Sequence, residues 1–162
     1  MVCGTILHTR HSFIRGVNRP FSALHARTFC HATEDLEKVR TALENTVGQH
    51  ELRISKIDGH HGNPITILET SLEDMNAIDA FFRKIERADF DKILSSLNSR
   101  MDEGCNLFIR IDKQAAFKGD IRLGRNDDVV FIRIHVRSFP AKLEIASPTV
   151  RDHLQGIRDE SG

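Results

Sequence analysis

Hydrophobic and polar residues alternate most clearly in the C-terminal third of the chain. Valine and isoleucine occupy every second position of residues 130–136, and Phe131, Arg133 and His135 lie between them. An alternation of period two predicts a β-strand with one face against a core and the other face open to solvent. Residues 107–112 show the same alternation, so we expect two such strands in this region.

Apolar residues recur at helical spacing in three other segments. The first segment follows Thr33, whose side chain is typical of a helix N-cap, and ends near Gly48. The other two apolar stripes cover residues 75–85 and 90–101. Each stripe predicts an amphipathic helix that packs its apolar side on a sheet.

Short runs rich in β-branched residues predict four further strands, and a weaker apolar stripe predicts a final helix over residues 148–157. The strands are expected at residues 24–32, 52–58, 65–72 and 119–123. The predicted order is β-α-β-β-α-α-β-β-β with a short C-terminal α-helix. Short connections between the last strands favour antiparallel pairing. The predicted fold class is therefore α+β, a largely antiparallel sheet with helices packed on one face.

Composition is that of a globular protein without a membrane span. The chain has 162 residues, of which 40% are hydrophobic and 28% are charged. Its three cysteines are far apart and form no C-x-x-C pair, so neither a disulfide framework nor a cysteine-based zinc module is predicted. We expect residues 22–162 to form one domain. Residues 1–21 are interpreted as a basic extension, with a transit peptide as the alternative.

Charge is unevenly distributed although the formal net charge is zero. Residues 34–106 carry nine basic and fifteen acidic residues, whereas residues 107–142 carry eight basic and four acidic ones. On the predicted open face, Arg133 and Arg137 flank His135, and residues of one strand face repeat every ~6.5–7 Å. That spacing is close to the phosphate spacing of an extended nucleic-acid backbone. The alternative is a solvated face of mixed charge.

The segment GHHGNP, residues 59–64, lies between two predicted strands. Its glycines and proline are typical of a hairpin loop. Adjacent histidines on an extended chain point in opposite directions, so His60 and His61 are poorly placed to share a metal ion. We predict no metal, no cofactor and no catalytic residue here. A contact of His60, His61 and Asn63 with RNA or a partner, and a purely structural turn, both remain open.

Four blocks, in order, carry a family resemblance: RTFCHATEDLEKVRTALENTV, DGHHGNPITILETSLED, MDEGCNLFIRIDKQAAFKGDIRL and VVFIRIHVRSFPAK. Between residues 27 and 142 the chain resembles an archaeal family described as RNA-binding or predicted exosome-subunit proteins. The resemblance implies a cytoplasmic protein whose fold is similar to the ribosomal large-subunit protein that contacts 5S RNA. Beyond residue 142 the chain departs from the family, because Pro148 is expected to interrupt the charged helix that usually follows.

The leading functional hypothesis is a noncatalytic RNA-binding or RNA-processing accessory protein, associated with the archaeal exosome. Its expected partners are RNA and proteins of RNA-processing complexes, with no membrane. The residues predicted to contact RNA are Arg110, Lys113, Gln114, Arg133, His135, Arg137, His60, His61 and Asn63. Phe108 and Phe131 are in phase with the basic residues and could stack on bases if they are exposed. For Lys113, an ion pair with Asp112 is the alternative.

The sequence is also compatible with two other functions. One is a protein–protein adaptor that does not bind RNA tightly. The other is a small hydrolase that uses His60, His61, His135 and Asp112, which requires these four side chains to meet in one pocket.

Overall fold

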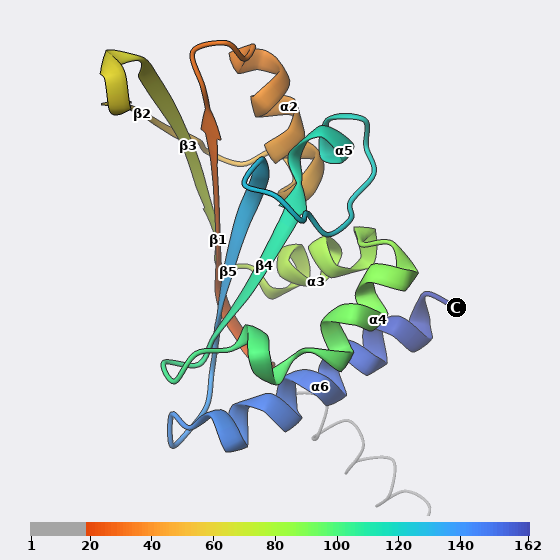
Figure 1. Cartoon of the computed structure of the whole chain (residues 1–162). Coiled ribbons are helices and arrows are strands. Elements are labelled where there is room, and N and C mark those ends of the chain that lie inside the picture. Colours follow the sequence, from red (N-terminus) through yellow and green to blue (C-terminus); the bar gives the residue numbers. More distant parts are fainter. Residues whose placement is uncertain (1–18) are drawn as a thin grey trace, which may run out of the picture.

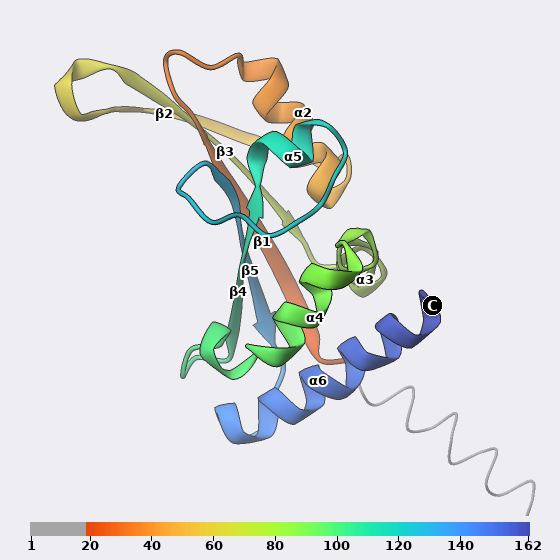
Figure 2. The same ribbon diagram turned by 45° about the vertical axis from the view of Figure 1, so that its right-hand side comes forward.

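The computed structural model describes residues 19–162, in which five antiparallel strands form one sheet (Figure 1). The strands are β1 (Phe21–Cys30), β2 (Arg53–Asp58), β3 (Pro64–Leu72), β4 (Asn106–Asp112) and β5 (Val129–Val136). Their order across the sheet is β2-β3-β1-β5-β4. The longest strand, β1, therefore lies in the middle and pairs with β3 on one side and with β5 on the other. Strands β2 and β3 form a hairpin whose tip projects beyond the rest of the sheet (Figure 2).

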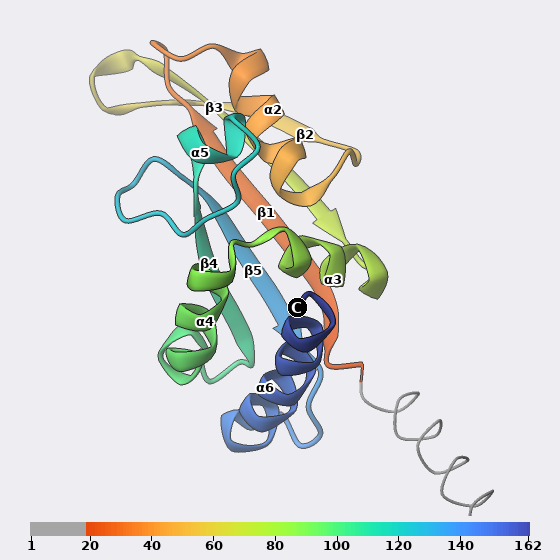
Figure 3. The same ribbon diagram turned by 90° about the vertical axis from the view of Figure 1, so that its right-hand side faces the viewer.

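The helices lie on one face of this sheet. They are α2 (Leu36–Val47), α3 (Met75–Lys84), α4 (Arg87–Ser95), α5 (Lys113–Phe117) and α6 (Leu143–Glu160). Figure 3 shows them in front of the strands, and Figure 1 shows the other face of the sheet without a helix. The predicted α+β class, with an antiparallel sheet covered on one side, is confirmed. In the part of the chain that the structure describes, no helix has the length and apolar character needed to cross a membrane.

The core lies between the sheet and the helices. The alternation in β5 correctly predicts which side chains of that strand face the core. The valine and isoleucine side chains of β5 are buried, whereas Arg133 and His135 are exposed. In the neighbouring strand β4, Leu107 and Ile109 are likewise buried, and Phe108 between them is exposed. The period-two pattern thus separates a core face from an open face on both strands.

Helix α2 begins two residues later than the sequence pattern predicts. Asp35, not Thr33, is the N-cap: its Oδ1 accepts hydrogen bonds from the backbone N–H groups of Glu37 (2.9 Å) and Lys38 (3.4 Å). Aspartate and threonine are both good N-caps, so sequence alone does not decide between them. Gly48, with φ of 90°, ends the helix as predicted.

The prediction of a short strand at residues 119–123 is wrong. Ile121 and Leu123 form only isolated bridges, and a short helix, α5, precedes them. The Asp112 side chain ends β4 and starts this helix, because it accepts a hydrogen bond of 2.8 Å from the backbone N–H of Ala115. A capped turn of good helix formers is therefore the preferred structure directly after β4.

Helix α6 is longer than predicted, and Pro148 does not interrupt it. The helix starts at Leu143 and continues through Pro148 to Glu160. Its buried apolar side chains keep helical spacing on both sides of the proline: Ala146, Val150, Leu154 and Ile157. Packing of this stripe on the core outweighs the hydrogen bond that proline cannot donate.

The predicted N-terminal extension, residues 1–21, lies outside the described residues as far as position 18. The described fold includes Pro20 and Phe21. Phe21 is only 2% exposed and stacks on Phe82 with 5.3 Å between ring centroids. The Pro20 carbonyl accepts a hydrogen bond of 2.6 Å from the backbone just after β5.

Neighbouring positions of β5 provide a test of the one-sided core. Ile132→Ala removes a buried side chain, and we expect it to lower the free energy of unfolding by about 2–5 kcal/mol. Arg133→Ala changes an exposed position and should alter it by less than about 0.5 kcal/mol. Urea denaturation of both variants measures the difference. Equal losses in the two variants would show that both faces of β5 are packed.

Candidate functional site

Two aromatic rings and two guanidinium groups alternate on the open face of strands β4 and β5. Strand β4 presents Phe108 and Arg110, and strand β5 presents Phe131 and Arg133. The pairing of the strands sets Phe108 opposite Arg133 and Arg110 opposite Phe131. Each ring therefore has an arginine as its cross-strand neighbour and another as its neighbour along the strand. We call these four residues the Phe–Arg square.

The two rings of the square have different surroundings. The Arg110 guanidinium carbon lies 5.5 Å from the centroid of the Phe131 ring, which is cation–π distance. The Phe131 ring also meets Phe29 of β1 in an edge-on contact, with 6.0 Å between centroids. Phe108 has no aromatic or cationic partner of this kind among the described residues, and 44% of it is exposed. Phe131 is thus held in place, whereas Phe108 offers a free surface.

The two arginines of the square have no ion-pair partner among the described residues. Across the sheet, Arg27 of β1 lies opposite Phe131 but forms an ion pair with Glu69, with 2.5 Å between its terminal nitrogen and the carboxylate oxygen. Arg110 and Arg133 form no ion pair within residues 19–162. A free guanidinium on an exposed sheet face retains its full capacity to donate to an anion.

A histidine of β1 extends this face next to the square. His25 lies opposite Arg133, and its Nδ1 is 2.8 Å from the hydroxyl oxygen of Ser71. Partial burial, and then the positive charge of Arg133, lower the pKa of His25 below its usual value. The imidazole is therefore neutral near pH 7, so the charge of this face comes from its arginines.

The open face is hollowed, and the hollow continues around the edge of the sheet. The face forms a shallow depression of about 1180 Å³. A second depression, of about 1080 Å³, follows the outer edge of β4 below α4 and contains Arg100, Arg122 and Arg125. Phe108 and Arg110 line both depressions. The second depression is of mixed charge, because Glu86, Asp89, Asp102 and Asp112 line it beside the arginines.

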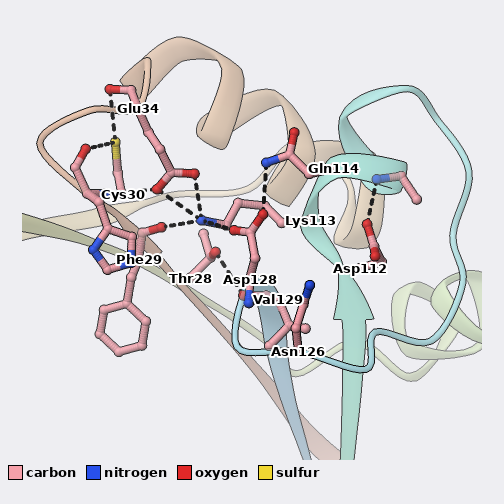
Figure 4. Close-up of polar contacts among 12 residues, drawn as sticks. Thr28, Phe29, Cys30, Glu34, Asp112, Lys113, Gln114, Asn126, Asp128 and Val129 are labelled. Atoms are coloured by element: carbon pink, nitrogen blue, oxygen red, sulfur yellow. Dashed lines mark hydrogen bonds and ion pairs between the residues drawn. The ribbon is translucent and has the colours of Figure 1, made fainter.

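Lys113, which the sequence places among the RNA contacts, lies inside a cluster of polar groups (Figure 4). The residue is 3% exposed. Its Nζ donates to the Phe29 carbonyl at 2.7 Å and forms ion pairs with Asp128 at 2.7 Å and Glu34 at 3.0 Å. These contacts join α5 to the end of β1, the segment before α2 and the start of β5. In this arrangement oxygens of Phe29, Glu34 and Asp128 already surround the ammonium group.

Gln114 belongs to the same cluster, because its amide donates to Asp128 at 2.8 Å. Burial raises the pKa of Asp128, but the bonds from Lys113 and Gln114 outweigh this effect and hold the pKa below its usual value. The predicted ion pair between Lys113 and Asp112 is wrong: Asp112 caps α5, and the partners of Lys113 are Glu34 and Asp128. RNA contacts of Lys113 and Gln114 stay predictions.

The GHHGNP segment forms the tip of the β2–β3 hairpin, away from the Phe–Arg square. His60, His61 and Asn63 are exposed there, and the two imidazole centroids are 5.3 Å apart. His61 has φ of 76° and Gly62 has φ of 77°, which together form the sharp turn. The hairpin-loop interpretation is therefore confirmed, and a contact of these side chains with RNA stays a prediction.

The four residues of the hydrolase alternative do not meet. His135 pairs with Ala23 near the start of β1, whereas the hairpin tip lies beyond Cys30 at its other end. Seven residues of extended strand separate these positions by roughly 23 Å. His135 and Asp112 also lie at opposite ends of the β4–β5 pair. Within residues 19–162 no three His, Cys, Asp or Glu side chains are grouped to hold a metal ion.

Of the residues predicted to contact RNA, Arg110, Arg133 and His135 lie together on the open face. Arg137 is exposed directly after β5. Sequence reasoning missed the contribution of β1, whose His25 and Arg27 alternate with the buried Leu24 and Ala26. That alternation is visible in the sequence, but it does not reveal that β1 pairs with β5.

The polar cluster around Lys113 generates a stability prediction. Lys113→Met leaves Glu34 and Asp128 without their counter-charge, and we expect it to lower the free energy of unfolding at pH 7 by about 2–4 kcal/mol. This is slightly below the range for fully buried pairs, because both carboxylates retain some exposure. Lys118→Met, an exposed change next to the same helix, is the control and should have little effect. Urea denaturation compares the three proteins.

The pH dependence of this loss follows from the lowered pKa of Asp128. A lowered native pKa contributes stability that is fully present above the unfolded value of about 3.9 and disappears as the pH falls below it. The difference between wild type and Lys113→Met should therefore shrink mainly below about pH 4, as the pH falls through the lowered native pKa of Asp128. An unchanged stability combined with weaker RNA binding would instead support the predicted phosphate contact of Lys113.

Known proteins match most of this chain. A family model described as RNA binding matches residues 23–136. An RNA-binding protein from Pyrococcus abyssi is 32% identical over 143 residues, which is 82% of this chain and 93% of the relative. The solved structure of a DUF54 protein from Methanothermobacter thermautotrophicus has a TM-score of 0.74 and 34% identity, and the match covers 83% of this chain and 98% of that one. A DUF54-family protein from Archaeoglobus fulgidus has a TM-score of 0.70 and 33% identity over 82% of this chain and 98% of its own. The chain therefore belongs to this RNA-binding family, and the matched region includes the whole Phe–Arg square.

Proposed function

We propose that this protein is a noncatalytic accessory protein that binds RNA on the open face of its sheet. The observation that carries the proposal is that Arg110 and Arg133 stand without a carboxylate partner on a face that no described helix covers. Such guanidinium groups bind phosphate with short, charge-assisted hydrogen bonds and release counterions from the nucleic acid. Membership of the family and the name of the Pyrococcus relative support RNA as the ligand.

The geometry of β5 supports contacts with successive phosphates. Arg133, His135 and Arg137 are two residues apart, and a strand repeats its same-face positions every ~6.5–7 Å. An extended RNA strand that runs along β5 therefore meets a donor at roughly each nucleotide. His135 adds an imidazole to this row, and its Nδ1 lies 3.2 Å from the side-chain oxygen of Asn106.

A role in RNA processing, with association with the archaeal exosome and a cytoplasmic location, is the finer part of the proposal. It rests on the resemblance of the four sequence blocks to the archaeal family. A protein–protein adaptor is the second candidate, because apolar side chains are also exposed: Phe108 on the face, and Ile54 and Ile57 on β2. RNA is favoured over a protein partner by the unpaired arginines beside Phe108.

The first functional prediction concerns Arg133 of β5 and Arg137, which directly follows that strand. Arg133→Ala plus Arg137→Ala should weaken RNA binding at low salt and leave the fold intact, because both side chains are exposed. Each lost phosphate contact lowers the slope of log affinity against log salt concentration by about 0.7 for a single strand, so two contacts lower it by about 1.4. Fluorescence-anisotropy titrations at several salt concentrations measure the slope, with circular dichroism as the folding control.

A charge-matched variant on the helix side controls for a general loss of positive charge. Arg40→Ala plus Arg83→Ala removes one guanidinium from α2 and one from α3, where they pair with Glu44 and Glu160. This variant should keep the slope of the wild type. If the wild type binds no RNA at low salt, the RNA proposal is lost and the adaptor takes its place. If both double variants bind alike, the open face is the wrong surface.

The hairpin tip should contribute less to the electrostatic part of binding. His60→Ala plus His61→Asn removes both imidazoles, and asparagine tolerates the positive φ of position 61. The hairpin tip lies away from the unpaired arginines of the open face, so the salt slope should change by less than about 0.7, the value of one phosphate contact. The same anisotropy titration at pH 7.5 measures it. A drop of about 1.4 would place phosphates at the hairpin tip.

A further inference from the structure

Phe108 presents a free aromatic surface in the middle of a charged face. Its neighbours along β4, Leu107 and Ile109, point into the core and are buried, so the strand is well anchored beneath it. The ring itself is 44% exposed, and Arg133 stands opposite it on β5. An aromatic ring beside an unpaired guanidinium is the combination with which proteins bind unpaired bases: the ring stacks on the base and the cation holds the backbone.

A second stacking surface lies next to the first. The Arg110 guanidinium rests over the Phe131 ring at 5.5 Å, and Phe29 of β1 packs against that ring in a T-shaped contact. Bases stack on planar guanidinium groups as well as on aromatic rings. Arg110 and Phe108 are two residues apart on β4, which places the two surfaces ~6.5–7 Å from each other. Arg133 lies opposite Phe108 and diagonal to Arg110.

This spacing selects one form of RNA. Bases in a duplex are stacked on each other and present only their edges, so an aromatic ring cannot reach a base face without unstacking it. Two neighbouring bases of a single strand, by contrast, can splay apart to the distance between two same-face positions of a β-strand. The separation of Phe108 and Arg110 therefore fits unpaired nucleotides rather than a continuous helix.

We propose that the Phe–Arg square binds two consecutive unpaired nucleotides. One base stacks on Phe108, the next stacks on the Arg110 guanidinium over Phe131, and Arg133 binds the phosphate between them. The inference rests on the proposed RNA binding and adds its substrate class: single strands, loops or ends, with little preference for sequence, because every base has a π-face.

The test compares a uridine decamer with an abasic decamer of equal charge. Phe108→Ala should weaken binding of the uridine decamer about 5- to 150-fold, as expected for the loss of one base–aromatic stack. The abasic decamer offers no base, so its affinity should not change. Because no charge is removed, the salt slope should also stay the same. Anisotropy titrations with the full chain measure all three quantities.

Phe117→Ala is the matched control. Phe117 is similarly exposed, at 38%, but it lies on α5 in the helix layer. This variant should bind the uridine decamer as the wild type does. A blunt duplex of the same length should bind more weakly than the decamer and should be insensitive to Phe108→Ala.

Arg110→Lys tests the second stacking surface. Lysine keeps the positive charge but lacks the planar group. Affinity for the uridine decamer should fall several-fold at an unchanged salt slope, whereas unchanged affinity would assign Arg110 a purely electrostatic role and overturn the second stack.

The outcomes separate this inference from the proposal on which it depends. If the wild type binds RNA with a steep salt dependence but Phe108→Ala and Phe117→Ala bind alike, RNA binding stands and the stacking site is overturned. The stacking site is also overturned if Phe108→Ala weakens the abasic decamer as much as the uridine decamer. If the wild type binds neither decamer, both proposals fail.

Discussion

The helices of this protein pack on only one face of the sheet, and this one-sided packing determines which strand positions must be apolar and which can carry other residues. An antiparallel sheet can leave one face to water, so each strand needs apolar side chains only at alternate positions. In β4 and β5 those positions hold the core, and the intervening positions are free to carry rings and charges. The Phe–Arg square exists because the core does not need these four residues.

The buried cluster around Lys113 connects the core to the square. Its ammonium group donates to the carbonyl of Phe29 at 2.7 Å, and the Phe29 ring makes a T-shaped contact with the Phe131 ring. Phe131 in turn lies under Arg110. A chain of contacts thus runs from the ion cluster to the open face, and it fixes the Phe131 ring that lies under Arg110. This arrangement is typical of a binding surface whose groups are held in position before the ligand arrives.

The sequence predicts features that depend on neighbouring residues, such as which side chains share a strand face. It does not predict features that depend on contacts between distant residues. The alternation in β4 and β5 is local, so it suffices to assign Arg110, Arg133 and the two rings to the open face. The burial of Lys113 depends on Glu34, which is 79 residues away, and no local pattern reveals it. The central place of β1 likewise depends on strand pairing over long distances. Thr33 and Asp35 are both good N-cap residues, so the sequence does not decide which of them begins α2, and the structure shows that Asp35 does.

The most direct test of the central claim is to map where RNA touches the protein. The full chain is crosslinked by ultraviolet light to a 4-thiouridine decamer, and mass spectrometry identifies the modified peptides. If RNA occupies the open face, the crosslinks fall in β4 and β5, at residues 106–112 and 129–137, and Phe108 is the main site. Crosslinks confined to α2, α3 or α6 would contradict this account, because those helices lie on the other side of the sheet.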